Sequence, residues 1–201
     1  MTRELVKVGI DIDDVKAKFM ETLQGWHNRR YGTSLARENI RDYDFWKIWG
    51  CDKDEGLRRM REFFQSADFE AIEPIEGSQE GCRELARDFD LVSITYRPVS
   101  SGKQTLPWIN NYFHGLFSAV YFANLFPPYG TIRKKVEICR EAGVRVMVDD
   151  SADVAEECYR AGIGVVLLNT PWNESRGLPS GICRADDWKG VVPAVRRLVS
   201  L

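Results

Sequence analysis

The sequence predicts an α/β fold in which helices cover a parallel sheet and one helical insertion interrupts the chain after the first strand. Three observations support this prediction. Short apolar runs rich in β-forming residues recur along the chain, at residues 5–12, 90–95, 118–122, 144–148 and 164–168. Helical stretches separate several of these runs and stop at glycine. A long segment, residues 15–75, breaks the alternation and carries no strand pattern.

The first apolar run, residues 5–12, is short and ends on acidic residues, which is typical of a buried strand that opens onto a polar edge. The insertion that follows is rich in aromatic residues. Phe19, Leu23 and Trp26 recur at helical spacing, and residues 54–65 form a second amphipathic pattern. This aromatic stripe indicates either the insertion's own core or a wall that faces a ligand.

The remaining elements follow as strands and helices in alternation. Helices are predicted at residues 78–88, at residues 134–142 before Gly143, and at residues 152–161 before Gly162. Such alternation implies right-handed β-α-β crossovers and a parallel sheet. Residues 169–181 are rich in Pro, Gly and Ser and predict a long surface loop, which either borders the site or only connects elements. Residues 188–201 predict an amphipathic helix despite Pro193; its apolar face docks on the core or makes a contact in a homodimer.

Composition narrows the class of protein. The chain has 201 residues, enough for one compact domain with a modest insertion, and a net charge of −2. Such a balance argues against nucleic acid polymers and anionic membranes as partners. No stretch of about eighteen apolar residues occurs, so no membrane span is expected. The five cysteines are widely spaced and lack the close pairs of zinc sites, which indicates reduced thiols and a cytoplasmic location.

Polar side chains collect where predicted strands end, which is where an open parallel sheet places its ligand crevice. They are Asp11, Asp13 and Asp14 after the first strand, Thr95, Tyr96 and Arg97 after the second, and Asp149 and Asp150 after the fourth. One acidic residue there could be a helix N-cap, but several together favour a shared site. Clustered carboxylates repel one another unless a cation compensates, and oxygen ligands favour magnesium. The sequence therefore predicts a magnesium site suited to phosphoryl transfer.

These residues resemble the four motifs of the haloacid dehalogenase superfamily, in order and across nearly the whole chain. The motifs are GIDIDDV at residues 9–15, SITYRP at 93–98, KVEIC at 135–139 and VMVDD at 146–150. The resemblance implies a Rossmann-like three-layer core with a small helical cap inserted after the first strand. The core would comprise residues 1–14 and 76–201, and the cap residues 15–75.

The resemblance also assigns catalytic roles. Asp11 would be the nucleophile that becomes phosphorylated, and Asp13 the acid that protonates the leaving oxygen and later activates water. Thr95 would donate its hydroxyl and amide to the phosphoryl oxygens. Lys135 would screen Asp11 and stabilise the transition state; Lys134 is the alternative, but the spacing of the motif fits Lys135 better.

Metal binding follows from the same resemblance. Asp150 would hold Mg²⁺ together with Asp11, Asp149 would support it, and the main-chain carbonyl of Asp13 would be a further ligand. A second aspartate at position 13 separates phosphatases from members that break carbon–halogen bonds, so a phosphate ester is the expected substrate. Arg97 is either a phosphate-binding fork or a salt-bridged group.

Similarity of individual motifs to one branch of the superfamily indicates the class of substrate. The first, second and fourth motifs look most like the branch of 5'(3')-deoxyribonucleotidases and their bacterial relatives, which implies a small phosphorylated metabolite, a nucleoside monophosphate, as substrate. Phe19 stands where that branch has an aromatic residue that stacks on the base; the alternative is that Phe19 packs in the hydrophobic core of the cap. Trp46 and Trp49 are further candidates for stacking on the base. A phosphatase for a sugar phosphate or another metabolite shares the chemistry. A non-catalytic binding module of the same fold is the third hypothesis.

Overall fold

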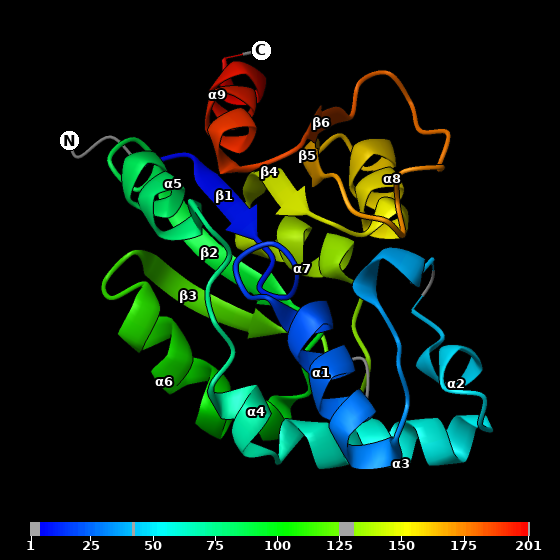
Figure 1. Cartoon of the computed structure of the whole chain (residues 1–201). Helices are drawn as coiled ribbons and strands as arrows, with labels where there is room; N and C mark the ends of the chain where they lie inside the picture. Colours follow the sequence, from blue (N-terminus) through cyan, green and yellow to red (C-terminus); the bar gives the residue numbers. More distant parts are fainter. Residues whose placement is uncertain (1–4, 42, 125–130, 201) are drawn as a thin grey trace.

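The computed structural model describes residues 5–41, 43–124 and 131–200 (Figure 1). Within these residues, six strands form one parallel sheet in the order β3-β2-β1-β4-β5-β6. The strands are β1 (Lys7–Ile10), β2 (Asp90–Thr95), β3 (Phe117–Phe122), β4 (Val144–Asp149), β5 (Gly164–Leu168) and β6 (Cys183–Ala185). The α/β fold with a parallel sheet is therefore confirmed.

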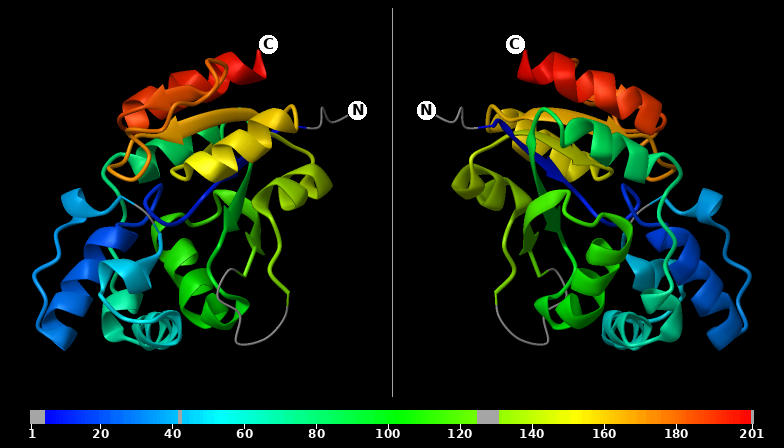
Figure 2. Two further views of the ribbon diagram at one scale, coloured as in Figure 1. Left: turned by 90° about the vertical axis from the view of Figure 1, so that its right-hand side faces the viewer. Right: turned by 90° about the vertical axis from the view of Figure 1, so that its left-hand side faces the viewer.

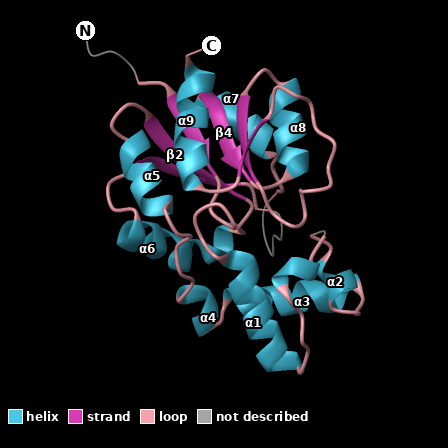
Figure 3. Ribbon diagram, turned by 45° about the horizontal axis from the view of Figure 1, so that its top comes forward, coloured by secondary structure: helices cyan, strands magenta, loops and turns pink. Residues whose placement is uncertain are grey.

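Helices lie on both faces of the sheet, as Figure 3 shows. One face carries α5 (Ser78–Leu85) and α9 (Trp188–Val199), which pack against each other; the other carries α7 (Lys135–Ala142) and α8 (Ala152–Arg160). A further helix, α6 (Gly102–Tyr112), links β2 to β3. Buried apolar side chains form a separate cluster on each side, which gives the three layers of a Rossmann-like core.

The central strand β1 places its carboxyl end where the order of the strands reverses, because β2 and β4 flank it. Its close packing depends on Gly9. A Cβ atom at this position would lie 2.8 Å from the Met147 sulfur and 3.2 Å from side-chain atoms of Ile94 and Val144. The absence of a side chain therefore lets the strand that carries Asp11 sit tightly in the middle of the sheet.

The segment between β1 and α5 is helical, as predicted. It contains α1 (Phe19–Tyr31), the 3-10 helix η1 (Arg37–Asn39), α2 (Phe45–Ile48), α3 (Lys53–Phe64) and α4 (Ala67–Glu70). Figure 2 shows these helices gathered beyond one end of the sheet. The two stretches of chain that enter and leave this segment run side by side. The Ile75 amide donates to the Lys16 carbonyl at 2.7 Å, and the Lys18 amide donates to the Glu73 carbonyl at 3.0 Å. The boundaries of core and cap stay a prediction.

Several predicted elements match the structure closely. The strands at residues 90–95 and 164–168 are confirmed, and α7 ends at Gly143, whose φ of 74° lies in the left-handed region that glycine adopts without strain. The helix at the C-terminus forms despite Pro193, which lies within α9, and its apolar face docks on the core through Trp188 and Val191. None of the helices in the described part of the chain is long and apolar enough to cross a membrane.

Three features differ from the sequence prediction. Strand β1 spans Lys7–Ile10 rather than residues 5–12, since the chain leaves the sheet to form the site loop. Helix α6 was not predicted, because Gly102 and Pro107 within it hide its helical pattern. Strand β6 was also missed, because a strand of three residues at the sheet edge carries too little alternation to detect.

Candidate active site

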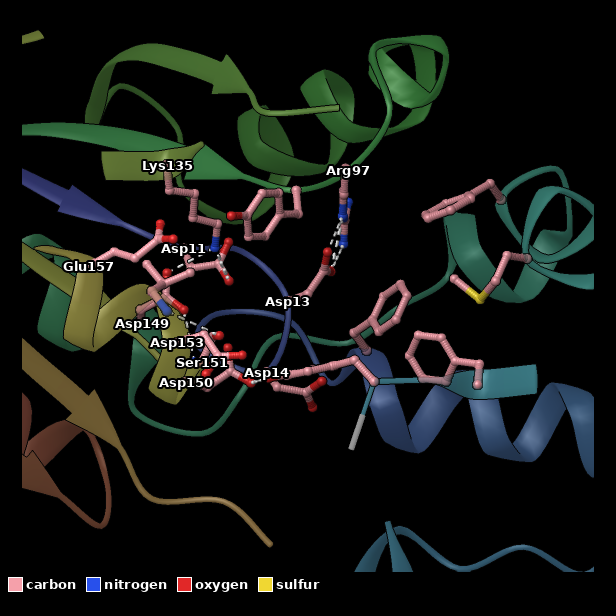
Figure 4. Close-up of a pocket in the computed structure, with 17 residues that line it drawn as sticks. Asp11, Asp13, Asp14, Arg97, Lys135, Asp149, Asp150, Ser151, Asp153 and Glu157 are labelled. Atoms are coloured by element: carbon pink, nitrogen blue, oxygen red, sulfur yellow. Dashed lines mark hydrogen bonds and ion pairs between the residues drawn. The ribbon is translucent and has the colours of Figure 1, made fainter. Parts of the chain in front are cut away.

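A pocket of about 260 Å³ lies where the carboxyl ends of β1 and β4 meet the helical insertion (Figure 4). Core residues supply charged groups to its lining and the insertion supplies mostly apolar ones. The lining residues are Asp11, Asp13, Asp14, Phe19, Tyr43, Phe45, Met60, Phe64, Tyr96, Arg97, Lys135, Asp149, Asp150, Ser151, Asp153, Val154 and Glu157.

Asp11 directly follows β1, and its amide donates to the Val148 carbonyl at 3.0 Å, which fixes it beside β4. Its side chain is buried, with 5% of the residue exposed. One carboxylate oxygen, Oδ2, lies 2.8 Å from the Lys135 ammonium, whereas Oδ1 is buried and has no hydrogen-bond partner among the described residues. Burial raises the pKa of Asp11 well above its ordinary value; Lys135 opposes the rise and Asp149 adds to it.

Lys135 is the first residue of α7 and is almost fully buried. Its Nζ lies 2.8 Å from Asp11 Oδ2 and 2.8 Å from Asp149 Oδ2, so one cation bridges two strand ends. Burial alone lowers the pKa of this amine, but the two carboxylates outweigh burial and hold the pKa above its ordinary value. Lys134, the alternative, is exposed and pairs with Glu157. The structure thus brings Lys135, and not Lys134, to Asp11.

Asp149 is the last residue of β4 and Asp150 follows it, and the two carboxylates have different hydrogen-bond partners. The second oxygen of Asp149 accepts the Ser151 amide at 2.9 Å. Asp150 Oδ2 accepts from the Tyr43 hydroxyl at 2.7 Å and from the Trp172 indole N–H at 2.8 Å. Burial and the neighbouring Asp149 raise the pKa of Asp150 to about 7. Asp150 is therefore fixed by both the insertion and the loop at residues 169–181.

Three buried carboxylates offer a set of donors that fits a divalent cation. One oxygen from each of Asp11, Asp149 and Asp150 lies within 4.8 Å of the others. Oxygen donors of this kind suit a hard ion such as Mg²⁺, and the unpartnered Asp11 Oδ1 leaves a buried lone pair for a ligand. The carboxylate of Asp13 lies outside this group, and its expected role through the main-chain carbonyl stays a prediction.

Asp13 instead forms a bidentate ion pair with Arg97. The guanidinium Nε lies 3.0 and 3.1 Å from the two carboxylate oxygens, and Nη2 lies 2.7 Å from Oδ1. The third nitrogen, Nη1, donates to the Thr105 hydroxyl at 3.2 Å. Figure 4 shows this pair apart from the cluster around Asp11 and Lys135. The sequence left Arg97 as either a phosphate fork or a salt-bridged group, and in the structure all three of its guanidinium nitrogens contact protein groups.

Thr95, the last residue of β2, is buried and does not line the pocket. Its side chain is fully buried, its hydroxyl accepts the Arg97 amide at 3.1 Å, and it is not among the lining residues. Of the predicted site residues, seven line this one pocket and Thr95 does not: the seven are Asp11, Asp13, Phe19, Arg97, Lys135, Asp149 and Asp150. The expected contact of Thr95 with phosphate stays a prediction.

The insertion forms an apolar wall opposite the carboxylates. Phe19 lines it beside Phe64, with ring centroids 6.2 Å apart. Neither Trp46 nor Trp49 lines the pocket; the Trp49 ring stacks on Phe45, at 5.5 Å, inside the insertion. Tyr43 and Phe45 come from the same sequence segment, but which of its residues face the site could not be read from an irregular helical pattern. Trp172, in the loop at residues 169–181, was missed because its contact with Asp150 joins segments that are distant in the sequence.

Comparison with known proteins gives one family match. Residues 4–199 match the family model described as "5' nucleotidase, deoxy (Pyrimidine), cytosolic type C protein". The protein named "Putative nucleotidase BH1399" from Halalkalibacterium halodurans is 24% identical over 193 residues, which cover 92% of this chain and 90% of that one.

Solved structures with the same fold include two hydrolases. A haloacid dehalogenase-like family protein, SP0104 from Streptococcus pneumoniae, has a TM-score of 0.67 at 13% identity and covers 97% of this chain and 100% of its own. The HAD-hydrolase YfnB from Bacillus subtilis, described as bound to magnesium, has a TM-score of 0.62 at 12% identity and covers 94% and 97%. At such low sequence identities, the similarity shows only that the fold is shared.

Proposed function

The chain belongs to the family of 5' nucleotidase, deoxy (pyrimidine), cytosolic type C proteins, and on that premise we propose that it is a magnesium-dependent phosphomonoesterase that acts on nucleoside monophosphates through a phosphorylated Asp11. The observation that carries the proposal is the buried cluster of Asp11, Asp149 and Asp150, in which Asp11 and Asp149 pair with the Lys135 ammonium. A carboxylate with one oxygen paired and the other without a partner is suited to attack an electrophile bound at the same place.

Asp11 begins the reaction as the nucleophile. Its Oδ1 forms a bond to phosphorus while the bond from phosphorus to the ester oxygen breaks, and Asp13 gives its proton to that leaving oxygen. Asp13 then accepts a proton from a water molecule whose oxygen bonds to the phosphorus of phosphorylated Asp11, while the bond from phosphorus to the Asp11 oxygen breaks; this releases phosphate and restores the Asp11 carboxylate. Lys135 neutralises the carboxylate that must meet an anionic phosphate, and Thr95 would donate to a phosphoryl oxygen.

A magnesium ion, when bound, would neutralise charge on the phosphoryl oxygens. Asp11 and Asp150 would hold it, with Asp149 in support, because their oxygens are close, buried and of the hard type that magnesium prefers. A hydrolase of the same fold is described as bound to magnesium, which supports the choice of metal. Ser151 and Trp172 orient the two carboxylates of β4 through the hydrogen bonds described above.

A nucleoside is the leaving group that the insertion's wall favours. Phe19, Phe45, Met60 and Phe64 present apolar or aromatic surface to the pocket, and a nucleobase offers a π face that such side chains hold. The family description and the nucleotidase name of the bacterial relative point the same way. A sugar phosphate would instead need donors and acceptors for its hydroxyls, which these four side chains do not supply.

The test is phosphate release from a panel of nucleoside monophosphates and sugar phosphates, with magnesium and with chelator. We expect turnover that requires magnesium, is highest on nucleoside monophosphates and vanishes in Asp11→Asn. Highest turnover on sugar phosphates would replace the substrate assignment. Activity that survives in the chelator or in the variant would refute the mechanism.

A further inference from the structure

We propose that Arg97 is a positioning residue that holds Asp13, the general acid and base, apart from the Asp11–Lys135 cluster. Part of the helical insertion contributes to the contacts that fix Arg97. The inference rests on the proposed function, in which Asp13 transfers protons. It assigns Arg97 to the catalytic carboxylate instead of to the substrate phosphate.

The contacts of the guanidinium support this assignment. Nε and Nη2 meet both oxygens of Asp13 in the bidentate geometry that fixes a carboxylate's orientation as well as its place. Nη1 is held by the Thr105 hydroxyl, so the planar group cannot rotate without losing a second partner. Only 2% of the Arg97 side chain is exposed, against 22% for Asp13. The buried partner is thus the fixed one, and the carboxylate at the pocket is what it orients.

Two aromatic side chains hold Arg97 itself. Its guanidinium carbon lies 4.7 Å from the centre of the Phe69 ring and 5.7 Å from that of Trp108, distances at which ring faces attract a cation. Phe69 belongs to α4 of the insertion and Trp108 to α6 of the core. The Trp108 indole N–H donates to the Ile72 carbonyl at 2.7 Å, which ties the chain after α4 to α6. The grip on Asp13 therefore spans the junction of insertion and core.

The two carboxylates of the Asp-x-Asp pair need such a separation. Lys135 is a buried cation that already attracts Asp11 and Asp149. A third mobile carboxylate would be drawn toward the same charge and would crowd the nucleophile. By pairing Asp13 with a cation of its own, Arg97 leaves Lys135 to Asp11 and keeps the proton-transfer group on the leaving-group side of the pocket.

The experiment compares two classes of phosphate ester. An alkyl ester such as a nucleoside monophosphate has a basic leaving oxygen that needs a proton, whereas p-nitrophenyl phosphate has a weakly basic one that departs without it. We expect Arg97→Gln and Arg97→Lys to lower kcat on the alkyl ester by about 10²-fold, the effect of a misplaced catalytic group. With the aryl ester, the first-turnover burst of p-nitrophenol reports only the attack by Asp11, so the rate of this burst should change by less than about threefold, whereas the later hydrolysis of phosphorylated Asp11 uses Asp13 with both esters. Lysine keeps the charge but cannot reproduce the bidentate contact. If Arg97→Gln impairs folding, Arg97→Lys therefore still tests the inference.

Two further readouts separate this role from a structural or phosphate-binding one. KM and inhibition by inorganic phosphate should stay within about threefold of the wild type, because binding is not affected. In an Asp13→Asn background, Arg97→Lys should cause no further loss on the alkyl ester, because residues that act as a unit are not additive. Arg83→Gln is the matched control, since Arg83 is an exposed arginine of α5 that pairs with Glu80.

Three outcomes would overturn the inference: a loss in the rate of the p-nitrophenol burst equal to the loss in kcat on the alkyl ester, weaker inhibition by phosphate, or additive losses in the double variant. The wild-type protein supplies the separate check on the proposed function. If it hydrolyses neither ester with magnesium, the proposed function fails and the inference falls with it. If it hydrolyses both, and the variants lose as much of the p-nitrophenol burst rate as of kcat on the alkyl ester, only the inference is wrong.

Discussion

Replacing Lys16 by methionine should make the protein more stable at neutral pH, because this lysine is buried at an energetic cost. Lys16 lies in the loop after Asp13, and none of it is exposed. Its Nζ donates to the Ser93 hydroxyl at 2.9 Å and lies 3.7 Å from the centre of the Phe117 ring. No carboxylate pairs with the amine among the described residues, so burial lowers its pKa from 10.5 to about 7.

The sign of the effect follows from proton linkage. Between pH 7 and pH 10.5 the unfolded chain holds a proton on Lys16 that the folded protein lacks, so the free energy of unfolding rises with pH across this window. The cost of a charged Lys16 is fully present below about pH 7 and disappears as the pH approaches 10.5. A pKa difference of about 3.5 corresponds to about 5 kcal/mol, of which about 4 kcal/mol is still felt at pH 7.

Methionine keeps the apolar stem and removes this cost. It also gives up the hydrogen bond to Ser93 and the contact of the cation with Phe117, each worth about 1 kcal/mol. The net expectation for Lys16→Met is a gain of about 2 kcal/mol in the free energy of unfolding at pH 7. The amine anchors the loop of Asp11 and Asp13 to β2, so a gain in stability with a loss of turnover would match the usual trade-off at functional sites.

Urea unfolding at pH 6, 7, 8 and 9 measures both the free energy of unfolding and its dependence on pH. The wild-type free energy of unfolding should gain about 1.4 kcal/mol per pH unit relative to the variant above pH 7, and the two curves should run parallel below about pH 6. Titrations that Lys16 does not influence cancel in this difference, and burial raises the pKa of the neighbouring Cys82 thiol to about 12, above the pH range of the measurement. Lys18→Met is the control, because Lys18 is a surface lysine that pairs with Glu73. A variant that is less stable than the wild type at pH 7, with an unchanged pH slope, would refute the reasoning.

Three further predictions concern the pocket. Lys135→Met should lower kcat by about 10²- to 10³-fold and destabilise the metal-free protein by about 3 to 5 kcal/mol, since it leaves buried carboxylates without their cation; steady-state kinetics and urea unfolding measure the two effects. Tyr43→Phe removes a donor to Asp150 and should weaken magnesium binding by about tenfold, measured by calorimetry, with unchanged affinity as the contrary result. Phe45→Ala should raise KM for nucleoside monophosphates by about five- to 100-fold and leave KM for glycerol phosphate unchanged; equal changes on both would remove Phe45 from base recognition.

The sequence was most informative where local chemistry decides structure. An apolar strand that ends in acidic residues predicted the places of Asp11 and Asp149, and a glycine after a short amphipathic run predicted the end of α7 at Gly143. Both signals act over a few residues, so they could be read without knowing what packs against them. The convergence of the strand ends then followed from the parallel sheet.

What the sequence left open depends on contacts between distant segments. Tyr43 and Trp172 are 129 positions apart and meet on one oxygen of Asp150, which no local pattern encodes. The pairing of Arg97 with Asp13 likewise joins residues 84 positions apart, so a fork for phosphate and a clamp for a carboxylate look alike in the sequence. Side-chain direction in the insertion's short helices depends on tertiary packing, which is why Phe45 lines the pocket while Trp49 does not.

The most direct test of the central claim is a single turnover stopped with acid. The enzyme, with magnesium, would be mixed with a substoichiometric amount of nucleoside monophosphate labelled in its phosphate, quenched within the first turnover, digested and analysed by mass spectrometry. We predict a phosphoryl group on the peptide that contains Asp11, which rises and then decays as free phosphate appears, and which is absent in Asp11→Asn. Full turnover with no phosphorylated peptide at any quench time would contradict the account, because water would then attack the substrate directly.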